Sequence, residues 1–337
     1  MIRCHIPGLF ESDVSKNNTR WGDCQIFYDG QFYDVIDGYC GEPARRMVKR
    51  LKNLGIKNVY VHISHTHHDH RNGIEMMIDD SYFNIYALYC QDPATLNKKF
   101  SSECANDVAV LERIINKARK RGIEVIYLKD GDKIIHGDTE IWVYRDQPKT
   151  APNTDAYIND GSLCYYFPKL KYLSTGDSGL WCAERHKLDV KFFKGGHHDN
   201  DNSGDTKKPS EMCRWLKQRG CEFFWDNDYS TTLTDFLMTG REDALNAGMQ
   251  FINIHGDINF VACNGKVTIY KGGQHWTYEC DYKGKNTLKS PNLTLVENVL
   301  KGQLGSSDTR VTNLLDKGYS PVGVQNHINI LYKLIKG

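Results

Sequence analysis

The chain has 337 residues and a formal net charge of +1, with 43 lysines and arginines balanced by 42 aspartates and glutamates. This length allows a full two-layer domain and a small second one, and the balanced charge argues against a broad electrostatic surface for nucleic acid or an anionic membrane. No segment reaches the roughly 20 apolar residues of a membrane span. The eleven cysteines include no Cys-x-x-Cys pair, which argues against a disulfide framework and a cysteine zinc site.

The first half of the chain predicts strands alternating with helices. Residues 1–8 lack an apolar signal region, so we expect synthesis in a cytoplasm without a signal peptide. The predicted elements, in chain order, are a hairpin at 22–37, a helix at 43–54, a strand at 58–63, a helix beginning at 72, a strand at 85–89, a helix at 103–120, a strand at 123–128 and a hairpin turning at 136–138.

The second half predicts another strand-rich set, followed by a small helical module. The strands extend from about 163 to 270, and the composition then shifts to a polar, Pro-containing segment. We therefore expect one domain over 1–282, a linker over 283–292 and a module over 293–337. Periodic apolar residues predict three short helices in the module, at about 293–301, 308–317 and 322–335.

The most informative segment is His65-Thr66-His67-His68-Asp69-His70, on the loop between the strand at 58–63 and the helix that follows. Three imidazoles and a carboxylate have little use in a core, where each would need its own hydrogen-bond partner. They are, however, the usual ligands of divalent transition metals. The alternative is a solvated histidine-rich loop. The position at a strand end, where an open sheet presents its ligands, favours the metal site.

This motif resembles that of the metallo-β-lactamase-fold hydrolases. The resemblance continues in Val35-Ile36-Asp37-Gly38, in Tyr172-Leu173-Ser174-Thr175-Gly176-Asp177 and in Phe192 to His198, each of which looks like a strand ending in a site residue of the family. It implies a four-layer αβ/βα sandwich and two divalent metal ions, with zinc expected and manganese as the alternative.

The residues of the motif divide between the two ions by geometry. His65 and His67 alternate on an extended segment and would hold one ion, whereas Asp69 and His70 turn back toward the other. The resemblance implies that His197 completes the second site, that Asp177 bridges both ions, and that Asp37 supports the loop from behind. Asp69 would also orient the hydroxide that such a pair of ions generates.

One expected element is missing, because many members of the family place a further histidine between the motif and the bridging aspartate. The only histidine there is His136, whose context predicts a hairpin turn. Instead, Ile158-Asn159-Asp160-Gly161-Ser162-Leu163 resembles the hydrolase domain of ComEC-type competence proteins, which cleave phosphodiesters. Asp160 is therefore a candidate oxygen ligand. The neighbour of His197, His198, is a candidate proton donor to the leaving group, or else a solvated histidine.

The last 45 residues resemble a small wall-binding repeat found in certain phage lysozymes and Gram-positive wall hydrolases. The matching positions are Val299-Leu300-x-Gly302, Gly305, Arg310, Leu314, Gly318-Tyr319 and Val324-Gln325-Asn326-x-x-Asn329. Ser306-Ser307 and Pro321 depart from the pattern. The resemblance implies a bacterial cell-wall partner, a muropeptide or wall polymer, held by Arg310, Tyr319 and Gln325. The alternative is an unrelated helical extension for dimerisation.

These observations lead to one main hypothesis and three alternatives. The main one is a phage-lysin-like, binuclear metal hydrolase that acts at the wall after release from the cytoplasm and cleaves a wall-polymer bond, with a phosphodiester favoured. The first alternative is a peptidoglycan amide or peptide hydrolase, since a bridging hydroxide serves either bond. The others are a competence-type nuclease, disfavoured by the neutral charge, and an inactive wall-binding protein, disfavoured by the nearly complete ligand set.

Overall fold

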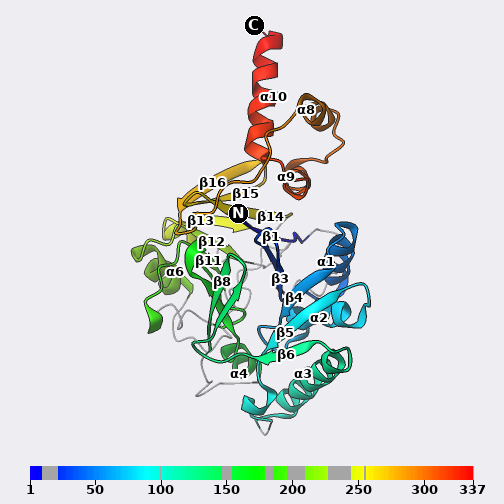
Figure 1. The fold of residues 1–337 in the computed structure, drawn as a ribbon. Coiled ribbons are helices and arrows are strands. Elements are labelled where there is room, and N and C mark those ends of the chain that lie inside the picture. The colour runs from blue at the N-terminus through cyan, green and yellow to red at the C-terminus, as the bar shows by residue number, and fades with distance from the viewer. Residues whose placement is uncertain are drawn as a thin grey trace.

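The computed structural model describes residues 1–9, 22–98, 100–145, 154–178, 185–195, 209–226, 244–253 and 256–336. Within these ranges the strands form two sheets, one of nine strands in the order β16-β15-β14-β1-β2-β3-β4-β5-β6 and one of seven in the order β13-β12-β11-β10-β9-β8-β7. Helices lie on the outer side of each sheet (Figure 1). The expected four-layer αβ/βα sandwich, with a small helical module after it, is therefore confirmed.

The first sheet joins the two ends of the predicted hydrolase domain, because β1 pairs with β14 on one side and with β2 on the other. From β3 to β6 its strands are parallel, so their carboxyl ends lie along one edge. Its strands are β1 (Ile2–Ile6), β2 (Gln25–Tyr28), β3 (Tyr33–Ile36), β4 (Asn58–His62), β5 (Asn84–Cys90), β6 (Glu124–Tyr127), β14 (Ile258–Cys263), β15 (Lys266–Lys271) and β16 (Gln274–Glu279).

The second sheet has a parallel part, β10 to β13, and an antiparallel part, β7 to β10. Its strands are β7 (Lys133–His136), β8 (Thr139–Tyr144), β9 (Cys164–Phe167), β10 (Tyr172–Ser174), β11 (Phe192–Lys194), β12 (Phe223–Asp226) and β13 (Gln250–Asn253). The helices of the sandwich are α1 (Gly41–Asn53), α2 (His68–Asp79), α3 (Ser102–Lys120), α4 (Thr154–Asp160) and α6 (Pro209–Gln218), with short 3-10 turns η2 (Pro93–Thr95) and η3 (Pro168–Leu170).

The core between the sheets is aromatic. Phe27 of the first sheet stacks on Phe167 of the second, with ring centroids 4.1 Å apart, and Tyr172 and Phe260 pack beside them at 5.3 Å from one another. Such rings supply much buried apolar area at low entropic cost. This packing fixes the two sheets face to face and thereby sets the relative position of their carboxyl-terminal edges.

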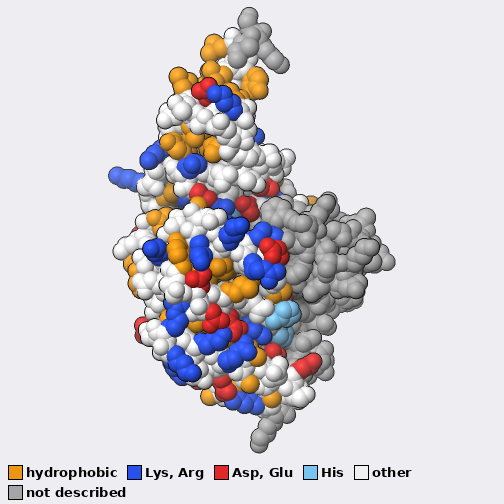
Figure 2. All heavy atoms as spheres, turned by 90° about the vertical axis from the view of Figure 1, so that its right-hand side faces the viewer, with side chains coloured by type: hydrophobic (Ala, Val, Ile, Leu, Met, Phe, Trp, Pro, Cys, Tyr) orange, Lys and Arg blue, Asp and Glu red, His pale blue; other side chains and the backbone are white. Residues whose placement is uncertain are grey.

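The outer face over α1, α2 and α3 carries a mixed charge. Figure 2 views the molecule from this side and shows Lys and Arg side chains interspersed with Asp and Glu, with histidines reaching the surface at one place. A cluster of this kind joins α3 to α2, where Lys117 Nζ lies 2.8 Å from both Glu75 and Asp79. The described part of this face therefore offers no continuous basic stripe of the kind that follows a nucleic-acid backbone.

The C-terminal module consists of α8 (Leu293–Leu300), α9 (Ser307–Asp316) and α10 (Pro321–Lys336), close to the three helices expected from the sequence. It has a small core of its own, which includes Val296, Leu314 and Val324. Helix α9 also packs against β14 and β15, where Val311 and Leu315 are buried with Val261 and Tyr270. The module therefore sits directly on one end of the first sheet, with α10 projecting away from it (Figure 1).

The helices and the cysteines of the described residues can be compared with the composition of the chain. No helix of the described ranges combines the length and apolar character needed to cross a bilayer. Every cysteine that the structure describes is free, and most are buried. They behave as small apolar residues, as their scattered spacing predicts.

Candidate metal centre

The histidine motif lies where β4 passes into α2, at the carboxyl-terminal edge of the first sheet. The helix begins at His68, four residues before the start expected from the sequence, and His67 is its N-cap. His65 and His67 therefore lie on the extended loop, whereas Asp69 and His70 lie in the first turn of the helix and point back toward the sheet. Because the backbone changes from loop to helix within six residues, the histidines of this short segment contribute to two neighbouring donor groups.

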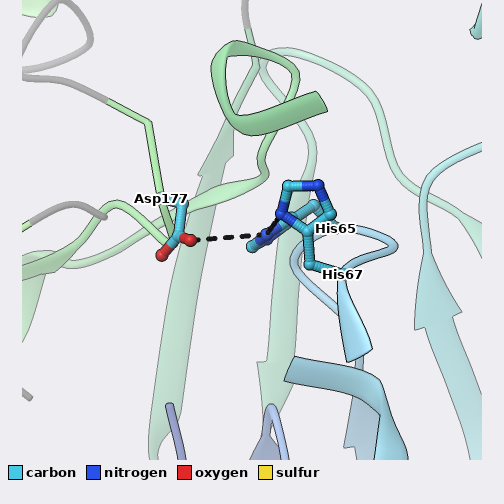
Figure 3. A group of neighbouring side chains, drawn as sticks. All are labelled: His65, His67 and Asp177. Carbon is cyan, nitrogen blue, oxygen red and sulfur yellow. Dashed lines mark hydrogen bonds and ion pairs between the residues drawn. The ribbon is translucent and has the colours of Figure 1, made fainter. Parts of the chain in front are cut away.

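The first donor group consists of His65, His67 and Asp177. Nε2 of His65 lies 3.1 Å from Nδ1 of His67 and 3.5 Å from Oδ2 of Asp177, so that the His65 ring stands between the other two side chains (Figure 3). Donors that share a tetrahedral ion with bonds of about 2.0–2.2 Å are about 3–3.5 Å apart. The three atoms therefore fit a divalent ion.

The second donor group consists of Asp23, His70 and Asp177, whose ligand atoms all lie within 4.8 Å of one another. Nε2 of His70 is 3.2 Å from Oδ1 of Asp177, the carboxylate oxygen that does not face His65. Oδ2 of Asp69 lies 4.0 Å from the same nitrogen. Asp177 thus presents one oxygen to each group, as a carboxylate must if it serves two ions.

The backbone at Gly176 brings Asp177 into this position. Gly176 has a φ of +57°, and a Cβ at this residue would approach the side chains of Ser64 and Ser162 to 3.1 Å. Both the left-handed conformation and the close approach favour glycine. The Thr-Gly-Asp sequence after β10 therefore places a carboxylate against the histidine loop of the other sheet.

Asp37 orients two of the imidazoles from behind. Its Oδ2 accepts from Nδ1 of His70 at 2.9 Å and from Oγ of Ser64 at 2.7 Å. Because that hydroxyl donates to Asp37, it can accept from Nδ1 of His65, 3.0 Å away. In a metal-bound form, both rings would keep their proton on Nδ1 and turn Nε2 toward the side of Asp177, where it could serve as a ligand.

Burial and charge act in opposite directions on these two rings. Burial lowers the pKa of His65 well below its ordinary value, and the neighbouring His70 lowers it further. Burial also lowers the pKa of His70, but the carboxylates of Asp177, Asp37 and Asp69 outweigh it and raise that pKa well above the ordinary value. The second group therefore lies in a strongly negative field, which favours a bound cation.

Two residues of this site were not predicted from the sequence. Asp23 precedes β2, where a single aspartate carries no motif, and its side chain reaches the site only through the pairing of β2 with β1 and β3. Lys194 ends β11, and its fully buried ammonium pairs with Asp23 and donates to the carbonyl of Gly176 at 2.7 Å. The one signal for it was a lysine at the end of an otherwise apolar strand.

Replacing Lys194 by methionine should destabilise the metal-free protein by about 3–5 kcal/mol, because it leaves buried carboxylates without their counter-charge. Bound divalent ions should restore part of the loss, since they compensate the same carboxylates. Urea unfolding with and without metal measures both effects. The matched control is Lys191→Met, whose ammonium is partly exposed and donates to the carbonyl of Gly220. Equal stability of the two variants would contradict this role for Lys194.

The other site residues predicted from the sequence are not found in either donor group of the described residues. His197 and His198 lie outside the described residues. Asp160 ends α4 and joins neither donor group within the described residues. His136 does precede a hairpin turn, but it is buried, and its nitrogens contact Asp34 at 2.7 Å and the hydroxyl of Tyr89 at 3.0 Å. With both nitrogens engaged, His136 cannot act as the missing third ligand.

Two more histidines lie in or near the motif without joining either donor group of the described residues. His62 lies inside β4, contacts Asp34 at 3.0 Å and stacks on Tyr89 with ring centroids 4.6 Å apart. The side chain of His68, inside the motif, is 61% exposed, and its Nδ1 lies 4.0 Å from Oδ1 of Asp69. Neither belongs to the groups that could hold a metal.

Solved structures with a metallo-β-lactamase fold resemble this chain. The metallo-β-lactamase-fold protein YhfI from Bacillus subtilis has a TM-score of 0.49 at 14% identity, covering 76% of this chain and 97% of its own. Tm1679, a metal-dependent hydrolase of the β-lactamase superfamily, has a TM-score of 0.48 at 12% identity, covering 78% and 99%. Igni18, a metallo-hydrolase from Ignicoccus hospitalis, has a TM-score of 0.45 at 14% identity, covering 77% and 99%.

No protein-family model matches the sequence, and no curated protein matches it. The described strands themselves form two facing sheets with helices on their outer sides, which is a four-layer αβ/βα sandwich. Many different substrates are compatible with one fold, so the activity of this chain must be argued from its own residues.

Proposed function

We propose that this protein is a hydrolase that depends on two divalent metal ions and cleaves a phosphodiester in a bacterial wall polymer. The observation that carries the first part is the position of Asp177, whose Oδ2 faces His65 and whose Oδ1 faces His70. A single carboxylate placed between two donor groups is the arrangement that a pair of ions about 3.5–4 Å apart requires. When bound, such a pair lowers the pKa of a shared water toward neutrality and so supplies hydroxide.

The residues around the donor groups would position the reacting water and exclude others. Asp69 lies beside His70 and is only 8% exposed, and in this position its carboxylate would orient a water and hold its proton. Asp37 and Ser64 keep the imidazoles in one tautomer, and Lys194 keeps Asp23 in place. No serine or cysteine lies in a nucleophile motif such as Gly-x-Ser-x-Gly, so direct attack by water is the mechanism that the chain supports.

The oxygen-rich character of the second donor group supports a phosphodiester as the scissile bond. This group combines one imidazole with Asp23 and Asp177, and Asp69 stands beside it. Carboxylate-rich sites suit manganese as well as zinc. Asp23, His70 and Asp177 would hold an ion beside the one held by His65 and His67, and such ions would supply charge stabilisation for a displacement at phosphorus. The same hydroxide could attack an amide, which makes peptidoglycan the alternative substrate.

The C-terminal module supports an action at the wall, which the protein would reach after its release from the cytoplasm. Arg310 and Gln325, two of its three predicted wall-binding residues, line one cavity at the surface of the module. The third, Tyr319, is partly buried against the module's own core and pairs through its backbone with Lys289. We therefore assign the binding role to Arg310 and Gln325, and a packing role to Tyr319.

We expect the metal-loaded protein to release phosphate-containing fragments from purified Gram-positive sacculi that retain teichoic acid, and nothing from sacculi stripped of it. Mass spectrometry of the released products identifies the bond. In oxygen-18 water, a single turnover should place one label in the product, because water attacks directly. Chelator should abolish release, and zinc or manganese should restore it.

Three outcomes would change this proposal. Fragments carrying new amino or carboxyl termini from stripped sacculi would identify a peptidoglycan amidase or peptidase instead. A covalent phosphoryl or acyl intermediate on the protein would exclude direct attack by water. Binding to sacculi with no products under any metal would indicate a wall-binding protein without hydrolase activity.

A further inference from the structure

A cavity lies where the C-terminal module meets the hydrolase domain. Its volume is about 270 Å³, and it is lined by the tip of the β15–β16 hairpin on one side and by α9 and α10 on the other. In Figure 1 this hairpin forms the top of the sandwich, directly below the module. The cavity therefore belongs to both parts of the chain, which the sequence assigned to separate domains.

The cavity wall carries a positive charge, which Arg310 supplies. The described residues that line it include no aspartate or glutamate. Nε of Arg310 donates to the carbonyl of Gly305 at 3.2 Å, and its two terminal nitrogens bond to no residue of the described ranges. The nearby Asp308 does not neutralise it, because that carboxylate binds Lys271 and the backbone of Gly272. A free guanidinium of this kind is suited to bind a carboxylate or phosphate in a two-pronged manner.

The rest of the wall combines amides with an apolar floor. Gln274 and Gln325 are exposed on opposite sides of the cavity, and Gln325 donates to Asn329 at 2.9 Å. Tyr270 lies at the base near His275, with ring centroids 6.2 Å apart. Exposed amides around an aromatic, apolar floor match a ligand that carries hydroxyl or amide groups on a carbon skeleton. Together with Arg310 they match such a ligand with one anionic group.

The two walls are held at a fixed distance. Asp308, in the first turn of α9, lies 3.0 Å from Lys271 at the end of β15. One helical turn later, Thr312 donates to Asp257 at 2.8 Å and accepts from Asn259 at the same distance. These contacts join α9 to the strands that carry the hairpin, so the cavity exists before a ligand arrives. A preformed site of this kind loses less entropy on binding.

We propose that this cavity is a composite binding site for an anionic fragment of a wall polymer, in which the hydrolase domain supplies one wall through Gln274 and His275 and the module supplies the other through Arg310 and Gln325. This inference rests on the proposed function for the source of the ligand. It differs from recognition by the module alone, because an isolated module lacks the hairpin side. Phosphate in a teichoic-acid chain and carboxylate in a peptidoglycan fragment share the chemistry that Arg310 requires.

Calorimetric titration of the full chain with two probes tests the proposal: a soluble glycerol-phosphate oligomer and a soluble disaccharide-peptide from peptidoglycan. We expect one of them to bind, with Arg310→Ala weakening it about 10- to 100-fold, as loss of a charge-assisted hydrogen bond implies. Arg310→Lys should be intermediate, and the double variant Gln274→Ala, His275→Ala should lose about 10-fold. Lys266→Ala, an exposed cation on the same hairpin outside the cavity, should bind like the unaltered protein. Thermal unfolding of each variant verifies that it is folded.

Several results would separate this proposal from the proposed function. Normal binding by the hairpin double variant, with loss in Arg310→Ala, would place the site on the module alone and overturn the composite site. Hydrolysis of wall polymer by a protein that binds neither probe would also overturn it, while leaving the hydrolase assignment intact. Binding that depends on both walls, in a protein that hydrolyses no wall polymer, would support the cavity and reject the proposed reaction.

Discussion

Replacing Asp177 by alanine is expected to reduce hydrolysis about a thousandfold or more, because several kcal/mol of charge stabilisation by the paired ions are lost together. Asp177 is buried, and each of its oxygens faces a different donor group. No other carboxylate of the described residues takes part in both groups. Metal analysis by mass spectrometry should find less than one ion per chain in this variant, against two in the unaltered protein.

Variants that remove a residue of only one donor group should lose only one of the two ions. His67→Ala should empty the first site and His70→Ala the second, so each should retain about one ion. A matched control is Asp189→Ala, which removes a half-exposed carboxylate that pairs with Lys171 at 2.7 Å outside the site. Two ions retained by Asp177→Ala, or full activity with one, would contradict a bridging role.

Replacing Leu315 by alanine is expected to destabilise the two-sheet domain by about 2–5 kcal/mol, although the residue lies in the C-terminal module. Leu315 is 1% exposed and packs with Val261 and Tyr270 of the first sheet. The loss should appear as a lower urea midpoint for the whole chain. The matched control is Leu334→Ala in α10, where the side chain is 74% exposed and its removal should cost almost nothing.

Polar contacts of α9 also join the module to the two-sheet domain, so removal of the whole module should lower the stability of the remaining chain. Asp316 pairs with Arg3 at 3.1 Å and also with Arg50, and the Asn259 that bonds Thr312 contacts His5 of β1 at 3.2 Å. A chain that ends at Lys289 should therefore unfold at least about 3 kcal/mol more easily than the full chain, since two or three large apolar side chains return to water. Equal stability of the two chains would show that the module is an independent unit joined by a flexible linker.

The sequence by itself determined the parts of the site that depend on local geometry. The motif at 65–70 contains several candidate donor side chains and its own change from loop to helix, so a metal site could be predicted there without knowing what packs against it. Asp37 and Asp177 each follow a buried strand at a turn, and strand ends at one edge of a sheet meet in space. The helices of the module followed in the same way from their apolar period, within one or two residues at most ends.

Only the tertiary structure decided which distant residues join these local pieces. Asp23 precedes β2 of the first sheet, whereas Lys194 ends β11 of the second sheet, 171 positions later in the chain (194 − 23). Their pairing places a buried cation beside the second donor group. Nothing in either local sequence specifies the partner, because an ion pair between sheets depends on how the aromatic core sets the two sheets face to face. The same holds for α9, whose amphipathic pattern predicted a buried side without showing that β14 and β15 would cover part of it. Periodicity fixes which side of an element is buried, whereas the element that buries it is decided by the free energy of packing the complete chain.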